Sequence, residues 1–185
     1  MSAYSIKDDL EHVLITAESI AQAVEQLGQR ITTDYVGKEP VFICILKGAA
    51  IFFSDLMRQV DLPLTIDFMA ISSYGNSTKT SGVVRILKDL DHDVLGRDVV
   101  VVEDIVDSGL TLSYIKKVLT ERGARSVRLA TLLDKPFRRR TELSVDYACF
   151  NIPNEFVVGY GLDYQEKYRN LPYVAVLHPK IYVEE

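Results

Sequence analysis

The residues with the most chemical potential lie in one stretch, where the acid pair Glu103-Asp104 follows four consecutive valines, residues 99–102. Two apolar residues then separate the acids from a second polar group, which consists of Asp107, Ser108, Gly109, Leu110 and Thr111. Hydroxyls and exposed N–H groups at the start of a helix can bind a phosphate. The two carboxylates can accept hydrogen bonds from vicinal hydroxyls or help to hold a divalent cation. The stretch therefore predicts a site for a phosphorylated sugar.

A strand and a helix must position this stretch. The β-branched run 99–102 suits a strand buried on both faces, as in a parallel sheet covered by helices. Ile115 and Leu119 stand at helical spacing, so a helix is predicted from about residue 110 to a C-terminal turn at Arg122-Gly123. Ligands of open α/β sheets bind beyond the carboxyl ends of the strands, where the acids and the turn would lie. The spacing Gly-x-x-x-x-Gly-Lys-Ser/Thr is absent from this stretch, which excludes a Walker-type nucleotide loop there.

A second strand and turn carry a cation. Residues 41–46 form an apolar run that predicts a buried strand, and Lys47-Gly48 follows it directly. Glycine allows the backbone to approach an anion, and the exposed N–H groups then point at it. An ordinary tight turn with a solvated lysine is the alternative interpretation.

Hydrophobic patterns predict the remaining elements of an α/β fold. A helix is expected from an N-cap at Thr16 to about Tyr35, because apolar residues recur there at helical spacing. A second helix should follow the Lys47-Gly48 turn. Further strands are predicted over residues 11–15, 64–72, 83–88, 127–133 and 171–177.

Three polar segments allow both a structural and a functional interpretation. Residues 73–82 are small and polar and contain glycines, which is typical of an exposed hairpin loop or of a lid that closes over a substrate. Asp91-His92-Asp93 predicts a solvated turn rather than a metal site, because no further histidine stands at ligand spacing. Arg138-Arg139-Arg140 predicts a solvated loop.

The composition predicts one globular domain over residues 1–185, with 48% hydrophobic and 25% charged residues. A formal net charge of -5 argues against general affinity for nucleic acid or for an anionic membrane. Cys44 and Cys149 fit no metal or redox spacing, which favours a reduced, cytoplasmic setting. The first residues form no apolar signal core, and no run approaches the roughly 20 apolar residues that span a membrane.

Five blocks of the sequence resemble the type I phosphoribosyltransferases and, among them, the bacterial hypoxanthine-guanine group. The blocks stand in the family's order: Leu46-Lys47-Gly48, Ser73-Tyr74, residues 103–111, Lys135, and Phe156 to Arg169. The resemblance implies an α/β fold with a parallel central sheet flanked by helices. It also implies a small hood formed by the N- and C-terminal segments, and a mobile hairpin lid that includes Ser73 and Tyr74.

Enzymes of this group transfer a 5-phosphoribosyl group from phosphoribosyl pyrophosphate to hypoxanthine or guanine and release pyrophosphate. The resemblance implies that Glu103 and Asp104 hold the ribose hydroxyls and contribute to the metal site. Hydroxyl and backbone groups of one turn would bind the 5′-phosphate: Asp107, Ser108, Gly109, Leu110 and Thr111.

The leaving group and the cofactor also have implied partners. Lys47, Gly48 and Arg169 would bind the pyrophosphate, and the resemblance implies a cis peptide bond between Lys47 and Gly48. Asp163 would hold Mg²⁺ together with the pyrophosphate. This ion would neutralise the charge that builds on the leaving group.

The purine would be bound on the other side of the sugar. Lys135 would donate to the 6-oxo group, which disfavours adenine because its 6-amino group is itself a donor. Phe156 would stack on the base, and the Val157 backbone would contact it. Asp107 would act as the general base at the imidazole edge of the purine. A carboxylate that caps its own helix is the structural interpretation of Asp107, and the two can hold simultaneously.

Some alternatives stay open at this point. Leu110 stands where many relatives have Lys or Arg, so the phosphate would rely on N–H groups and hydroxyls. A regulator that binds phosphoribosyl pyrophosphate without turnover is one rival function, and a transferase for adenine or a pyrimidine is another. The sequence does not rank hypoxanthine, guanine and xanthine. Relatives form homodimers and homotetramers, and we expect one of these states.

Overall fold

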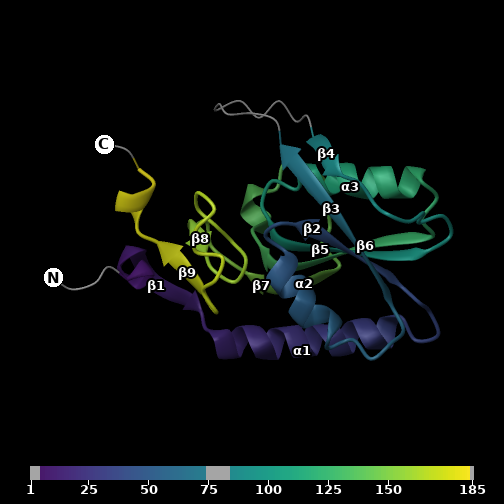
Figure 1. The fold of residues 1–185 in the computed structure, drawn as a ribbon, viewed down its shortest axis with the longest axis horizontal. Coiled ribbons are helices and arrows are strands. Elements are labelled where there is room, and N and C mark those ends of the chain that lie inside the picture. The colour runs from purple at the N-terminus through teal and green to yellow at the C-terminus, as the bar shows by residue number, and fades with distance from the viewer. Residues whose placement is uncertain (1–4, 74–83, 184–185) are drawn as a thin grey trace.

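The main sheet lies at the centre of the structure, a computed structural model that describes residues 5–73 and 84–183 (Figure 1). Within these residues the sheet holds six strands in the order β4-β3-β2-β5-β6-β7. Their bounds are β2 (Val41–Leu46), β3 (Thr65–Ser73), β4 (Val84–Lys88), β5 (Asp98–Val106), β6 (Ser126–Asp134) and β7 (Tyr147–Asn151). β3 pairs antiparallel with β4, and the other neighbouring strands pair parallel. The prediction of a mostly parallel central sheet is confirmed.

Helices cover both faces of this sheet (Figure 1). α1 (Ala17–Asp34) and α2 (Ala50–Met57) share a core cluster on one face, and α3 (Leu110–Glu121) forms a second cluster on the other. The valines of β5 alternate between the two layers. Val100 and Val102 belong to the α1–α2 cluster, whereas Val99 and Val101 belong to the α3 cluster. All four are fully buried, which explains why the central strand is a continuous β-branched run.

The long N-terminal helix begins and ends where its sequence predicts. The Thr16 hydroxyl at the N-cap accepts a hydrogen bond from the Ser19 N–H at 3.2 Å, and the C-cap is Tyr35. A hydroxyl at this position satisfies one of the N–H groups that a helix start leaves unpaired.

A second, smaller sheet brings the two ends of the chain together. β1 (Leu10–Ile15) pairs antiparallel with β9 (Val174–Leu177), which pairs antiparallel with β8 (Val157–Val158). Three short 3₁₀ helices, η1 (Ile6–Asp9), η2 (Pro136–Arg138) and η3 (Pro179–Ile181), complete the described elements. Figure 1 shows this sheet beside the body of the main sheet, so the expected hood of N- and C-terminal segments is confirmed. We call this sheet, the segment 159–173 that joins β8 to β9, and η3 the hood.

Three expectations about the backbone need correction. β5 runs on to Val106, so the acid pair lies within the strand and not after it, because β6 continues to pair with it through Asp134. The last strand begins at Val174 rather than at residue 171. The non-proline cis peptide bond joins Leu46 to Lys47, one bond earlier than the resemblance implied.

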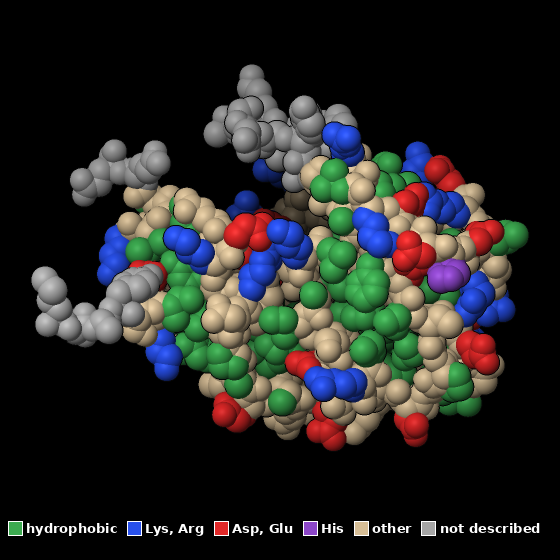
Figure 2. Space-filling model, viewed as in Figure 1, with side chains coloured by type: hydrophobic (Ala, Val, Ile, Leu, Met, Phe, Trp, Pro, Cys, Tyr) green, Lys and Arg blue, Asp and Glu red, His purple; other side chains and the backbone are tan. Residues whose placement is uncertain are grey.

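The surface mixes both signs of charge. On the face drawn in Figure 2, acidic and basic side chains are interspersed rather than gathered by sign. In residues 5–73 and 84–183, no helix combines the length and the apolar character that a bilayer crossing requires.

Candidate active site

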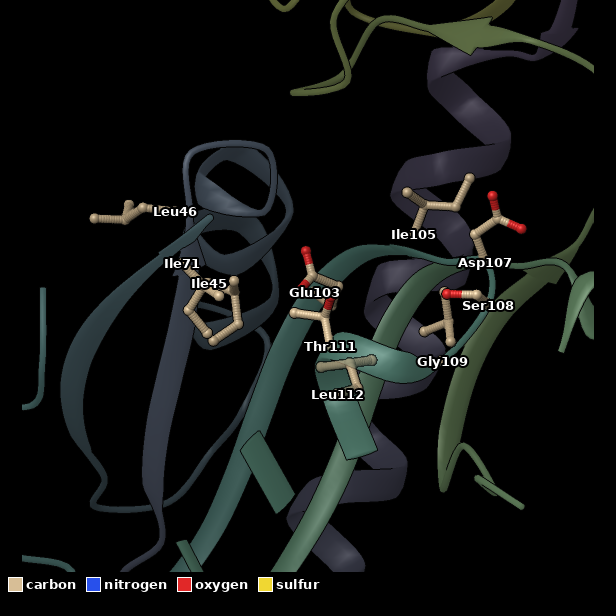
Figure 3. A pocket seen from close by; sticks show the side chains of 11 residues that line it. Ile45, Leu46, Ile71, Glu103, Ile105, Asp107, Ser108, Gly109, Thr111 and Leu112 are labelled. Carbon is tan, nitrogen blue, oxygen red and sulfur yellow. The ribbon is translucent and has the colours of Figure 1, made fainter. Parts of the chain in front are cut away.

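The turn between β5 and α3 forms one wall of a cavity of about 230 Å³. Gly109 is the N-cap of α3 with φ of 79°, a left-handed conformation that favours glycine. The Leu110 N–H in the first turn of this helix donates to the Ser108 hydroxyl at 3.4 Å. Figure 3 shows the lining side chains, which come from β2, β3, β5 and the start of α3. The lining includes the hydroxyls of Ser108 and Thr111 beside a helix N-terminus, a combination that suits an anion.

Asp104 of the β5 acid pair faces the turn that follows β2. A Cβ atom at Gly48 would lie 1.7 Å from Oδ2 of Asp104, so only glycine allows this approach. Burial raises the pKa of Glu103 well above its ordinary value, and the adjacent Asp104 carboxyl raises it further. Burial also raises the pKa of Asp104. A ligand that donates hydrogen bonds or carries positive charge would therefore stabilise the ionised pair.

The turn after β2 meets the hood at a cluster of charged side chains. Lys47 Nζ lies 3.1 Å from a carboxylate oxygen of Glu166, and the Arg169 guanidinium lies 2.8 Å from Oδ1 of Asp163. Arg169 also donates to the Gly161 carbonyl at 2.8 Å. The hydrogen bonds from Lys47 and Arg169 lower the pKa of Glu166. Lysine and arginine from two segments of the chain thus hold carboxylates at this edge of the sheet.

A second cavity, of about 530 Å³, lies between the main sheet and the hood. Lys135 is 7% exposed and its Nζ donates to the Glu155 carbonyl at 2.7 Å. Burial lowers the pKa of Lys135, and the Asp107 carboxylate partly offsets this effect. Phe156 also lines this cavity and is 39% exposed. The cavity thus offers a buried cation and an open aromatic ring.

The two cavities share Ile105 and Asp107 in their linings. Asp107 therefore lies between the hydroxyl-rich turn after β5 and the cavity that Phe156 lines. The second cavity also includes Asp104, Val157 and Asp163. The structure thus gathers most of the site residues named from the sequence around two adjoining spaces. Ser73 is the last residue of β3, and Tyr74 with the rest of the expected lid lies outside the described residues.

Arg138 and Arg140 are exposed, as predicted for a solvated loop, but the arginine triplet also contacts the site. Arg138 Nε lies 2.7 Å from Oδ1 of Asp107, and its guanidinium donates to the Asn154 side chain at 2.9 Å. Arg139 donates to the Asp107 carbonyl at 3.1 Å and forms an ion pair with Asp134. The Arg140 N–H donates to the Ser108 carbonyl at 2.9 Å.

These contacts arise because β6 runs parallel to β5. The chain that leaves β6 therefore starts beside the chain that leaves β5, as the hydrogen bond from the Lys135 N–H to the Val106 carbonyl demonstrates at 2.9 Å. Sequence reasoning missed Arg138 as a neighbour of Asp107. The available signal was its position, three residues after Lys135 at the carboxyl end of a central strand.

The segment 91–93, which the sequence predicts to be a solvated turn rather than a metal site, forms a backbone turn. The N–H groups of Asp91 and His92 donate to Oδ2 of Asp67 at 3.0 and 3.2 Å. The segment 91–93 thus encloses a buried carboxylate of β3, as expected for a turn before a strand.

The family model for the phosphoribosyl transferase domain matches residues 14–165. The chain belongs to the phosphoribosyltransferase family. A hypoxanthine-guanine phosphoribosyltransferase from Streptococcus thermophilus is 49% identical over 177 residues, which cover 96% of this chain and 98% of that protein. The solved structure of a hypoxanthine phosphoribosyltransferase from Staphylococcus aureus has 45% identity and a TM-score of 0.95, with 100% of both chains covered.

One of the relatives is a bifunctional protein that is much longer than this chain. The Listeria monocytogenes protein named "Bifunctional protein TilS/HprT" is 52% identical over 180 residues. The match covers 97% of this chain but only 28% of that protein, so this chain spans little more than a quarter of its length. Within the family, the matches over nearly whole chains place this chain in the hypoxanthine-guanine group.

Proposed function

We propose that this chain transfers the 5-phosphoribosyl group from phosphoribosyl pyrophosphate to hypoxanthine or guanine, forming a nucleotide and pyrophosphate in purine salvage. The observation that carries the proposal is the pair of adjoining cavities that share Asp107. One has the hydroxyls and helix N-terminus that a phosphate needs, and the other has the cation and aromatic ring that a 6-oxopurine needs.

The sugar would be bound by residues of β5 and the turn that follows it. Ser108, Gly109 and Thr111, with backbone N–H groups of Asp107 and Leu110, bind the 5′-phosphate in this proposal. Glu103 and Asp104 accept hydrogen bonds from the ribose hydroxyls. As the bond at C1 breaks, positive charge develops on the ring, and the two carboxylates stabilise it.

The purine would lie in the larger cavity. Lys135 donates to the 6-oxo group, Phe156 stacks on the ring, and the Val157 backbone contacts its edge. Asp107 takes the proton that the purine nitrogen loses when that nitrogen bonds to C1 of the sugar. The Arg138 guanidinium, with Nε 2.7 Å from Oδ1 of Asp107, helps to hold this side chain in place for that task.

The pyrophosphate would bind where the turn after β2 meets the hood. Lys47, the Gly48 backbone and Arg169 supply donors. In the described residues, no three acidic, histidine or cysteine side chains converge as a metal cage. Asp163 fits Mg²⁺ nonetheless, because this ion is commonly held by one or two carboxylates together with substrate phosphates. When bound, the ion would neutralise charge on the leaving group, with Glu103 and Asp104 as the further acids within the site.

A panel of bases tests this proposal. The purified protein with Mg²⁺ and phosphoribosyl pyrophosphate is incubated with hypoxanthine, guanine, xanthine or adenine, and nucleotide and pyrophosphate are measured together. We expect inosine monophosphate from hypoxanthine with equal release of pyrophosphate. Preferential turnover of adenine would contradict the assigned purine site. Binding of phosphoribosyl pyrophosphate without release of pyrophosphate would favour a regulator.

The setting of the enzyme is part of the proposal. We propose one domain over residues 1–185 that acts in the cytoplasm as a homodimer or homotetramer, without a nucleic-acid or membrane partner. The mass of the assembly in solution, measured by light scattering after gel filtration, tests the oligomeric state.

A further inference from the structure

Three aromatic rings from separate parts of the chain meet beside the larger cavity. Phe156, which precedes β8, stacks on Tyr182, which follows η3, with ring centroids 4.7 Å apart and planes at 22°. Tyr164 and Phe156 form a T-shaped pair with ring centroids 5.7 Å apart and planes at 87°. Tyr164 and Tyr182 are 6.5 Å apart. The proposed base-stacking ring is therefore itself held by two tyrosines.

One surface of Phe156 remains open in spite of these neighbours. Tyr182 stacks on the ring and Tyr164 packs against it in a T-shape, yet the residue is 39% exposed. Phe156 and Tyr182 both line the cavity of about 530 Å³ that Lys135 and Asp107 share. A flat ring has two faces, so a purine can use the one that Tyr182 leaves free.

Tyr182 is in turn held by the hood. It packs beside a buried cluster formed by residues of β8, β9 and the segment between them: Val158, Tyr168, Leu171 and Leu177. Its N–H donates to the Pro179 carbonyl at 3.1 Å at the end of η3. The Phe156 carbonyl accepts from the Leu177 N–H at 2.9 Å, which fixes the backbone but leaves the ring to be oriented by its neighbours.

We propose that Tyr182 is a positioning residue for the purine: it backs the Phe156 ring and so orients the face on which the base stacks. The inference deepens the proposed function and rests on it. Without this ring, Phe156 can turn about its side-chain bonds, and base binding must then restrict that freedom. The opposite arrangement has Tyr182 occupying the place of the base. The exposed part of Phe156 and the cavity that it lines together with Tyr182 favour the backing role.

The variants Tyr182→Leu and Tyr182→Phe test the inference. Leucine removes the ring, so we expect the KM for hypoxanthine to rise about two- to tenfold. This range corresponds to the stabilisation that one aromatic pair usually contributes. Phenylalanine keeps the ring and should restore the wild-type KM. The kcat and the KM for phosphoribosyl pyrophosphate should change little in both variants. An unchanged or lower KM for hypoxanthine in Tyr182→Leu would overturn the inference, the lower value because it means that Tyr182 competes with the base.

Binding without turnover separates this inference from the proposed function. Calorimetry is done with inosine monophosphate and with ribose 5-phosphate on the wild type and both variants. We expect Tyr182→Leu to weaken only the binding of inosine monophosphate. Equal weakening of both ligands indicates a merely structural role and overturns the inference. Failure of the wild type to bind inosine monophosphate overturns the proposed function, and the inference falls with it.

Discussion

The sugar-phosphate side and the purine side of this site are built in different ways. The first comes from one run of nine residues, 103–111, at the end of β5 and the start of α3. The second combines Lys135 after β6, Phe156 before β8 and Tyr182 after η3. The sugar-phosphate side is formed by consecutive residues and needs only the correct local backbone geometry. The purine side also needs the hood to be correctly placed against the main sheet.

The two sides also differ in charge. Burial raises the pKa values of Glu103 and Asp104 on the sugar side, and it lowers the pKa of Lys135 on the purine side. Burial thus disfavours the charged form of each of these groups, and a complementary ligand would favour it. Variants that affect one side and spare the other test whether this division is real.

The largest effect is expected at Asp107, where the two sides meet. Asp107→Asn keeps the shape but removes the proton acceptor, so kcat should fall by about 10²- to 10⁴-fold. The KM for phosphoribosyl pyrophosphate should stay within about twofold, because the phosphate contacts come from other groups. Steady-state kinetics with both substrates varied measures this split. Equal losses in kcat and in sugar-phosphate binding would contradict the role as a base.

Lys135→Met should affect the purine side alone. A hydrogen bond from a charged donor is worth about 1.5–3 kcal/mol, so the KM for hypoxanthine should rise about 10- to 100-fold. The KM for phosphoribosyl pyrophosphate is the internal control. A comparable rise in both KM values would mean that the two sides are not separable at this lysine.

The same variant makes a pH prediction testable. Burial lowers the pKa of Lys135, so as pH rises the ammonium is lost before an ordinary lysine with pKa of about 10.4 would lose it. The ratio of hypoxanthine KM in Lys135→Met to that in the wild type should therefore decline from a lower pH than for an exposed lysine. Ionisation of hypoxanthine in solution lowers the concentration of its neutral form equally for both proteins, and that decrease cancels in this ratio. A constant ratio up to the ordinary lysine range would contradict the buried position.

The contact between the hood and the turn after β2 can be tested with a pair of glycine variants. A Cβ atom at Gly161 would lie 2.1 Å from the Gly48 carbonyl oxygen, so Gly161→Ala must displace one of the two loops. Because small displacements at a site are costly, we expect the KM for phosphoribosyl pyrophosphate to rise about tenfold.

Gly37→Ala is the matched control for this change. Gly37 also has positive φ, of 74°, but a Cβ there meets nothing within 4 Å in the described part of the chain. Gly37→Ala should therefore destabilise the protein only through backbone strain, by about 1–2 kcal/mol. Its melting temperature should fall by about 2–4 °C for each kcal/mol. Its kinetic constants should match the wild type. A similar kinetic loss in both variants would mean that strain, and not the contact with Gly48, is responsible.

The comparison also explains how much the sequence could predict. The β5–α3 turn was predictable because its valines, acids and Gly109 lie close together in the sequence. Each of these residue types indicates the structure at its own position. The contact of Arg138 with Asp107 depends on the parallel pairing of β6 with β5, and that of Tyr182 with Phe156 depends on the pairing of β8 with β9. No local pattern of residues encodes these contacts. The end of β5 was placed too early for the same reason, since its partner strand decides where pairing stops.

The smallest effect is expected at Arg138, which joins the two sides through Asp107. This ion pair is half-exposed, and exposed pairs are worth about 0.2–1 kcal/mol, so Arg138→Gln should lower kcat/KM for hypoxanthine by only about two- to fivefold. Arg138→Lys keeps the charge but lacks the planar fork that reaches both Asp107 and Asn154, and should recover the loss in part. Asn154→Ala removes the other end of the link and should act in the same direction. A gain in activity on loss of Arg138 would instead show that the arginine competes with the purine for Asp107.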